Sequence, residues 1–247
     1  MLGILDWGIG GVSIYKLIKE RIGDVPVVYF SDTGVTPYGR MSRAALVDRL
    51  NSVIGFLRFE GVTHLVIGCN AASTAIEFFD PQGLKIIGII ESGVAAAMKH
   101  KPSRLGLIGG RRTVLSGVYR NAFAEQGIKI EQRIAQPLSA LIESGDVSSQ
   151  KLKLECRRIL APMKNCSHIL LACTHYPAII PLMQEFVSAK TQFVDPADAL
   201  LLLIKKWRVR GGGGDKIFTT GKCDLMKTAA DLAWQVKLKA IANVRIV

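Results

Sequence analysis

Two cysteines occupy equivalent places in a pair of similar segments. The first segment reads HLVIGCN at residues 64–70 and contains Cys69, and the second reads HILLACT at 168–174 and contains Cys173. A second matching pair has nearly the same offset: LGIL at 2–5 and LGLI at 105–108. Because two matches in register are much less expected by chance than one, they indicate an internal repeat. Each repeat then carries one cysteine.

Apolar runs alternate with helix-like stretches along the whole chain, which predicts parallel sheets covered by helices. Residues 43–59 carry apolar side chains at helical spacing. The run of four glycines at 211–214 predicts a flexible loop before one last strand and helix. The predicted buried strands are 2–5, 25–30, 64–67, 85–89, 105–108, 169–171 and 192–194. The predicted fold is α/β, built from two related units.

Each cysteine is placed just beyond the carboxyl end of a predicted strand, where parallel sheets bind their ligands. If the two units face each other about a pseudo-twofold axis, Cys69 and Cys173 approach a central cleft from opposite sides. Each would also lead into a helix N-terminus. There the free N–H groups favour a thiolate and can hold a substrate carboxylate.

Two facing thiols suit the inversion of a carbon stereocentre, which needs a base on one face and an acid on the other. A cysteine with a pKa of about 8.5 is mostly thiol at neutral pH, so each needs a neighbour that adjusts its proton. Asp6, at the end of the first strand, and His175 are candidates. Redox chemistry is an alternative that no CxxC pair supports, and buried packing is common for single cysteines. The repeat favours catalysis.

Other chemistry-bearing residues predict no metal or cofactor. The glycine loop at residues 8–11 reads GIGG, without the GxGxxG spacing of a dinucleotide site. No Cys/His spacing indicates a metal, no P-loop is present, and no lysine suggests a pyridoxal Schiff base. The remaining candidates are predicted to be structural: Cys156, Cys166 and Cys223, with His64 and His168 as packing residues at strand edges.

Composition limits the location and the partners. Five widely spaced cysteines form no disulfide framework, which predicts a reducing cytoplasm, and no apolar run reaches the roughly 18 residues of a membrane span. The formal charge is +12, with 32 Lys and Arg against 20 Asp and Glu. The basic clusters at 151–158 and 205–210 favour solvated helix faces over a nucleic-acid surface, because runs of charge are mostly solvated.

Several motifs in order resemble the glutamate racemases of the aspartate/glutamate racemase superfamily. The resemblance runs from Leu2 to about Asp198. The motifs are LDxGxGG at 5–11, Asp32-Thr33 with Pro37-Tyr38-Gly39, Cys69-Asn70, GxxExG at 88–93 and ACTHYP at 172–177. The resemblance implies two domains that face a cleft: residues 1–92 joined by 207–247, and residues 93–206. It also implies a homodimer and no cofactor.

The resemblance also implies roles for individual residues around a small amino-acid substrate. Asp6 would assist Cys69, while His175, with Glu143, would assist Cys173. Binding of the substrate's carboxylates and amino group falls to Tyr38, Gly39, Asn70 and Thr174. Trp7, Ala71 and Thr113 complete the predicted binding set.

Three positions depart from the family pattern. It has hydroxyl residues where this chain has Trp7, Ala71 and Gly110, and each lost partner for a buried charged ligand costs about 1–3 kcal/mol. Three functions stay open on the sequence. The leading one is a glutamate racemase supplying D-glutamate for peptidoglycan. The others are a racemase or isomerase for another small acid such as aspartate, and a catalytically weak protein that binds an acidic partner through its basic surface.

Overall fold

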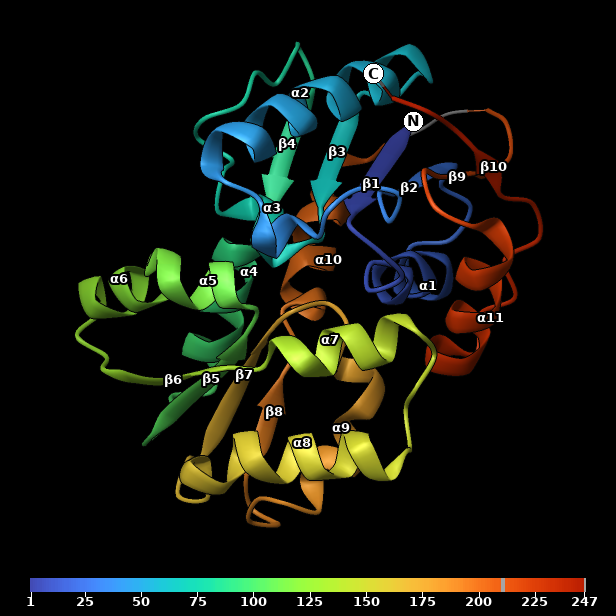
Figure 1. Cartoon of the computed structure of the whole chain (residues 1–247). Coiled ribbons are helices and arrows are strands. Elements are labelled where there is room, and N and C mark those ends of the chain that lie inside the picture. Colours follow the sequence, from blue (N-terminus) through green and yellow to red (C-terminus); the bar gives the residue numbers. More distant parts are fainter. Residues whose placement is uncertain (210–211, 247) are drawn as a thin grey trace.

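Two parallel β-sheets form the framework of the protein, one in the upper and one in the lower half of Figure 1. The structure, a computed structural model, describes residues 1–209 and 212–246. Arg210 of the predicted basic cluster and Gly211 of the predicted loop lie outside the described residues.

The first sheet contains β1 (Leu2–Asp6), β2 (Val27–Ser31), β3 (His64–Ile67), β4 (Lys85–Gly88), β9 (Lys216–Thr219) and β10 (Ala242–Asn243). The second contains β5 (Leu105–Gly109), β6 (Ile130–Ile134), β7 (His168–Ala172) and β8 (Gln192–Val194). The helices of the first half are α1 (Val12–Arg21), α2 (Arg43–Phe59), α3 (Asn70–Ser73) and α4 (Ile89–Lys99). Those that follow are α5 (Arg111–Ser116), α6 (Val118–Glu125), α7 (Gln136–Glu143), α8 (Gln150–Leu160), α9 (Ile180–Gln184), α10 (Ala197–Trp207) and α11 (Cys223–Trp234). Short 3-10 turns are η1 (Tyr38–Arg40), η2 (Ala161–Met163) and η3 (Tyr176–Ile179).

The internal repeat is confirmed by the strand order and by the register. The order is β10-β9-β2-β1-β3-β4 in one sheet and β6-β5-β7-β8 in the other, so four strands follow the same path in each. Leu2 pairs with His64 in the first sheet, and Leu105 pairs with His168 in the second. The two similar pairs of sequence segments therefore occupy equivalent places, and the two histidines begin equivalent strands.

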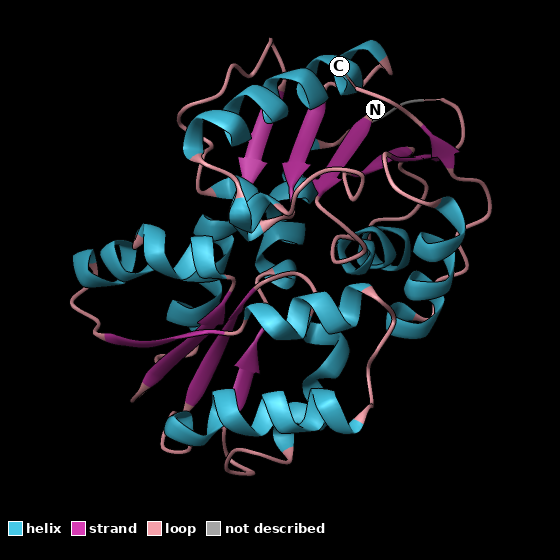
Figure 2. Cartoon of the chain, viewed as in Figure 1, coloured by secondary structure: helices cyan, strands magenta, loops and turns pink. Residues whose placement is uncertain are grey.

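The central strands of the first sheet, β1 and β2, are largely apolar because both faces are covered by helices (Figure 2). Ile4 and Tyr29 face the core formed with α1, α10 and α11, whereas Leu5 and Phe30 face the core formed with α2. Residues at alternate positions along each strand therefore enter different cores.

Most predicted elements are confirmed, with shifted ends. The helix at 43–59 has its predicted bounds, and Ser42 caps it by accepting a hydrogen bond from the Ala45 N–H. The strand predicted at 25–30 covers 27–31, and Ile89 begins α4 rather than ending β4. The strand β6 was not predicted. Its sequence, IEQRI, is largely polar because it is an edge strand that is only partly buried.

The C-terminal segment returns to the first sheet, as the resemblance implied. Strand β9 pairs with β2, β10 pairs with β9, and Trp234 of α11 donates its indole N–H to the Ile9 carbonyl at 2.9 Å. The predicted boundaries at 92/93 and 206/207 fall within α4 and α10, which pack against each other. We propose that the chain crosses between the two domains in these helices. Within the described ranges, no helix has the length and hydropathy needed to span a membrane.

Candidate active site

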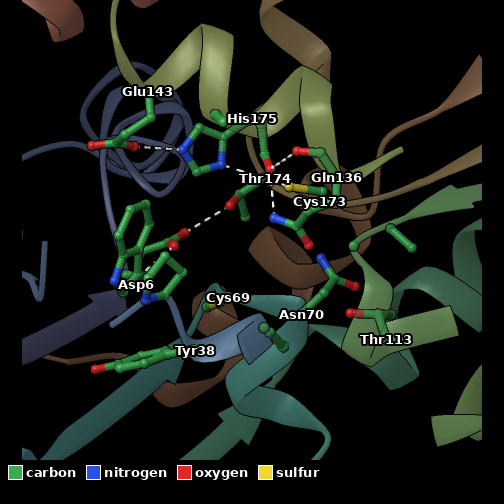
Figure 3. A pocket seen from close by; sticks show the side chains of 18 of the residues that line it. Asp6, Tyr38, Cys69, Asn70, Thr113, Gln136, Glu143, Cys173, Thr174 and His175 are labelled. Atoms are coloured by element: carbon green, nitrogen blue, oxygen red, sulfur yellow. Dashed lines mark hydrogen bonds and ion pairs between the residues drawn. The ribbon is translucent and has the colours of Figure 1, made fainter. Parts of the chain in front are cut away.

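A cavity of about 320 Å³ lies at the carboxyl ends of β1, β3 and β7, and residues of both domains line it (Figure 3). Every side chain predicted for the site borders this one cavity. They are Asp6, Trp7, Tyr38, Gly39, Cys69, Asn70 and Ala71 from the first domain, with Thr113, Glu143, Cys173, Thr174 and His175 from the second. Residues as far apart in sequence as Asp6 and His175 are therefore brought together, and the cysteines come from equivalent strands.

Cys69 is buried at the N-terminal end of α3, where it caps the helix. Burial raises the pKa of its thiol well above the usual range, and the charge of Asp6 raises it further. Hydrogen bonds from the backbone N–H groups of Ala72 and Trp7 act in the opposite direction without overcoming burial. The backbone N–H groups at the helix N-terminus thus favour the thiolate, as expected, but they do not decide the direction of the shift. Helix α3 is one turn long, and desolvation of the thiolate outweighs its effect.

Asp6 ends β1 beside Cys69 and is fully buried. One carboxylate oxygen accepts the backbone N–H of Trp7 at 2.7 Å, and the other accepts the Thr174 hydroxyl at 2.7 Å. Burial raises the pKa of Asp6, although His175 and the Thr174 hydrogen bond act to lower it. Asp6 therefore acts on Cys69 through its charge, and its contact with Thr174 joins the two domains.

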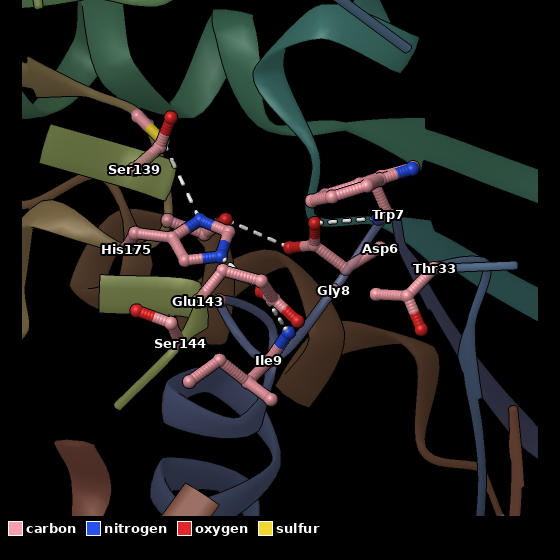
Figure 4. Close-up of polar contacts among 12 residues, drawn as sticks. Asp6, Trp7, Gly8, Ile9, Thr33, Ser139, Glu143, Ser144 and His175 are labelled. Carbon is pink, nitrogen blue, oxygen red and sulfur yellow. Dashed lines mark hydrogen bonds and ion pairs between the residues drawn. The ribbon is translucent and has the colours of Figure 1, made fainter. Parts of the chain in front are cut away.

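Cys173 lies beside a second acid–base pair (Figure 4). Its sulfur is 3.6 Å from His175 Nδ1, and His175 Nε2 is 2.6 Å from Glu143 Oε2. Burial acts to lower the pKa of His175, but its hydrogen bonds to Cys173 and Glu143 raise that pKa well above its usual value. His175 is therefore a group that can exchange a proton with the adjacent Cys173 sulfur, and Glu143 favours its charged form. The helix predicted after Cys173 is instead a 3-10 turn that begins at Tyr176.

The glycine loop at residues 8–11 allows the second domain to approach the first closely. A Cβ added to Gly8 would lie 2.6 Å from Oε1 of Glu143 and closer still to Oε2. A Cβ on Gly10 would lie 2.8 Å from Nδ1 of His175. The loop also donates the Ile9 N–H to Glu143 Oε2 at 2.9 Å. This contact explains why the loop is rich in glycine although its spacing differs from that of a dinucleotide site.

Two of the predicted binding residues have part of their polar groups engaged by the protein. The Tyr38 hydroxyl donates to Asp32 Oδ2 at 2.7 Å, and Asn70 Oδ1 accepts the Tyr119 hydroxyl at 2.8 Å. Asn70 Nδ2 is buried and has no hydrogen-bond partner among the described residues. It is a donor free for a ligand in the cavity.

Tyr38 is held by a buried ion pair. Arg49 Nε donates to Asp32 Oδ2 at 2.8 Å, and Nη2 donates to Oδ1 at 2.7 Å. The same Asp32 carboxylate accepts the Tyr38 hydroxyl, and Arg49 also donates to the Ile246 carbonyl at 2.8 Å. The C-terminal segment thus supports the wall of the cavity that contains Tyr38.

Trp7 borders the cavity, but its ring nitrogen is used elsewhere. The indole N–H donates to the Val35 carbonyl at 3.2 Å, and Figure 4 shows the nitrogen at the end of the ring farther from His175 and Glu143. Ala71 and Gly110 border the cavity without polar side chains. The three departures from the family pattern therefore all lie at the site.

Sequence reasoning missed two polar lining residues of α7, Gln136 and Ser139. With Glu143 they are spaced three and four residues apart, which places them on one face of the helix. This spacing was the available signal, because α7 carries apolar residues on its other face.

Comparison with known proteins agrees with this geometry. Residues 2–204 match the family described as Asp/Glu/Hydantoin racemase. The chain belongs to this racemase family. Glutamate racemase from Synechococcus sp. (strain CC9605) is 34% identical over 203 residues, which cover 80% of this chain and 76% of that protein. Glutamate racemase from Aquifex aeolicus (strain VF5) is 32% identical over 217 residues, 86% of this chain and 85% of that protein.

Family members with known structures share the fold over the whole chain. Glutamate racemase from Francisella tularensis subsp. tularensis SCHU S4, solved in complex with D-glutamate, superposes with a TM-score of 0.87 at 22% sequence identity. The match covers 99% of this chain and 97% of that one. The predicted fold of two parallel-sheet α/β domains and the predicted isomerase class are thereby confirmed.

Proposed function

We propose that this protein is a glutamate racemase that inverts its substrate by proton transfer between Cys69 and Cys173. The observation that carries the proposal is that the two cysteines, from equivalent strands of the two domains, border one cavity, each with its own acid–base neighbour. Relatives at 34% and 32% identity that are named glutamate racemases support glutamate as the substrate. The D-glutamate formed would supply peptidoglycan synthesis.

The resting site is asymmetric in a way that suits this chemistry. Cys173 contacts His175, whose pKa is raised and which can exchange a proton with it, whereas burial raises the pKa of the Cys69 thiol. For one enantiomer, the Cys173 thiolate removes the α-proton and the Cys69 thiol delivers a proton to the opposite face. The reaction leaves a Cys173 thiol and a Cys69 thiolate. For the other enantiomer the roles are reversed.

Other residues hold the substrate while the proton moves. Asn70 Nδ2 supplies a buried donor for a carboxylate, which stabilises the charge that develops when the α-proton leaves. The hydrogen bond from Thr174 to Asp6 fixes the carboxylate beside Cys69. Glu143 fixes the orientation of His175 and stabilises its charged form, as a carboxylate partner does for a catalytic histidine.

The test follows the circular dichroism of L-glutamate in the presence of the purified protein. We expect the signal to decay to the racemic value, and both Cys69→Ser and Cys173→Ser to abolish the decay. Cys223→Ser is the matched control, because this cysteine lies at the start of α11 and does not border the cavity. A wild-type signal that is steady for hours, or substantial activity in either cavity variant, contradicts the proposal.

A second candidate is a racemase for another small acid, such as aspartate. It is favoured by Trp7, Ala71 and Gly110, which border the cavity without a free hydroxyl. Exchange of the α-proton in D₂O, measured by NMR over a panel of acids, distinguishes the two candidates. Faster exchange with aspartate than with glutamate favours the second. The homodimer and the cytoplasmic location remain predictions.

A further inference from the structure

Gln136 is the first residue of α7 and extends its side-chain amide into the cavity, between Cys173 and Asn70 in the view of Figure 3. Its Oε1 accepts the backbone N–H of Arg111 at 3.1 Å, and its Nε2 donates to the Ser139 hydroxyl at 3.1 Å. An amide nitrogen carries two hydrogens. The second makes no hydrogen bond within the described part of the chain, so Gln136 has a donor to spare.

The same amide fills the space in front of two glycines from different domains. A Cβ on Gly39 would lie 3.3 Å from Gln136 Oε1, and a Cβ on Gly110 would lie 3.2 Å from it. Both separations are shorter than an ordinary van der Waals contact. Gln136 therefore occupies the place that a side chain at position 110 would otherwise take.

Gly110 cannot itself cap the N-terminus of α5 with a side chain, so another residue supplies the cap. Gly110 is the N-cap of α5 and has no side chain that could accept a hydrogen bond from the first turn. Gln136 Oε1 accepts the N–H of Arg111, the first residue of that helix. The carbonyl of the amide therefore replaces a cap, which leaves the NH₂ group for the cavity.

Some donors in the cavity are already engaged. Those of Trp7 and Tyr38 are engaged by Val35 and Asp32. Free donors remain on the other polar side chains that border the cavity and make no further hydrogen bond within the described residues, namely those of Arg40, Asn70, Thr113 and Gln136. Among them, Gln136 is the one that lies against Gly110. A buried carboxylate needs such donors, because burial without hydrogen bonds costs free energy.

We propose that Gln136 is a substrate-binding, specificity-determining residue. Its free Nε2 hydrogen donates to the substrate carboxylate that lies toward α5, in place of the polar side chain that Gly110 lacks. The inference rests on the proposed function. It goes further by naming the group that supplies the missing contact.

The decisive variant is Gln136→Glu, which has the same size and retains an acceptor for the Arg111 N–H. It replaces the donor with an anionic oxygen that repels the substrate carboxylate. We expect KM for glutamate to rise at least about tenfold, with kcat within about threefold and Tm unchanged. Gln150→Glu is the matched control, because Gln150 is the exposed first residue of α8, outside the cavity.

A pair of substitutions tests whether Gln136 replaces a side chain at position 110. Gly110 has φ −63° and ψ 157°, which threonine adopts readily. Gly110→Thr alone would crowd Gln136, and Gln136→Ala alone would remove the donor, so each should raise KM. In the double variant the threonine hydroxyl has room both to cap α5 and to face the cavity. Its KM should be lower than that of Gln136→Ala.

The outcomes separate the two proposals. A wild-type protein that exchanges no α-proton with any acid tested overturns the proposed function. A wild-type racemase whose KM is unchanged by Gln136→Glu overturns the inference about Gln136 alone. A fall in Tm without a change in KM also overturns it, because Gln136 would then only cap α5. Additive effects in the double variant refute the replacement of the side chain at position 110.

Discussion

A single methyl group in the glycine loop should impair the site without replacing any catalytic side chain, because it would displace Glu143. In Gly8→Ala the new Cβ would lie 2.6 Å from Glu143 Oε1 and closer still to Oε2. To reach an ordinary contact of 3.4 Å, the carboxylate must withdraw by at least about 0.8 Å. The oxygen bonded to His175 is Oε2, the closer of the two, so it must move by more than about 0.8 Å. A withdrawal along that bond would lengthen it from 2.6 Å to more than about 3.4 Å, beyond ordinary hydrogen bonding.

Loss of this contact should lower the pKa of His175, because burial then acts on it without the opposing carboxylate. We expect kcat/KM for L-glutamate to fall about a hundredfold, equivalent to about 2.7 kcal/mol of transition-state stabilisation. The alkaline limb of the pH profile of kcat/KM should also move to lower pH. Glu143→Gln should reproduce both effects, and combining the two substitutions should add little.

The assay is circular dichroism of glutamate across a pH series, with a thermal melt of each variant to confirm folding. Gly214→Ala is the control, because a Cβ there meets no atom within 4 Å. If Gly8→Ala has kcat/KM within threefold of wild type and an unmoved alkaline limb, then the contact between the glycine loop and Glu143 does not support catalysis.

Two further predictions concern stability. Arg49→Lys should lower the free energy of unfolding by about 3 kcal/mol, because the buried two-point contact with Asp32 is lost. Urea titration measures this change, and a decrease below about 1 kcal/mol would contradict the prediction. Burial raises the pKa of Asp195 to about 6 from its usual 3.8. The folded protein thus loses stability as pH rises from about 4 to about 6, by about 1.4 kcal/mol per unit. Asp195→Asn should remove this dependence of stability on pH and raise Tm at pH 7, since Asn still accepts the Ala197 N–H. A Tm that depends on pH as in the wild type would contradict this prediction.

The sequence predicted much of the cavity lining, because several of these residues are fixed to the ends of buried strands. An apolar strand that is followed by a polar or reactive residue can be recognised from the sequence. The internal repeat further indicated that Cys69 and Cys173 follow equivalent strands, as the strand order and register show. Strand β6 was missed because an edge strand need not be apolar. Its neighbour β5, buried on both sides, was found almost in full.

Contacts between the domains could not be predicted in the same way. The place of Gln136 depends on a close approach to Gly39 and Gly110, which lie in different domains and carry no side chain that could mark the contact. The protonation of Cys69 depends on the shortness of α3 and on complete burial, neither of which its own residue type specifies. The position of Gln136 and the protonation of Cys69 therefore both depend on tertiary packing.

The return of the C-terminal segment to the first sheet has a consequence for synthesis on the ribosome. Strand β2 is completed at Ser31, but its partner β9 begins at Lys216, 185 residues later. At about 5–20 residues per second, the apolar edge of β2 stays unpaired for roughly 10 to 40 s. The strands of the second sheet, from Leu105 to Val194, are all translated within that interval. The nascent chain thus begins one domain, can fold the other first, and carries an open strand edge, a site prone to aggregation, until the last segment emerges.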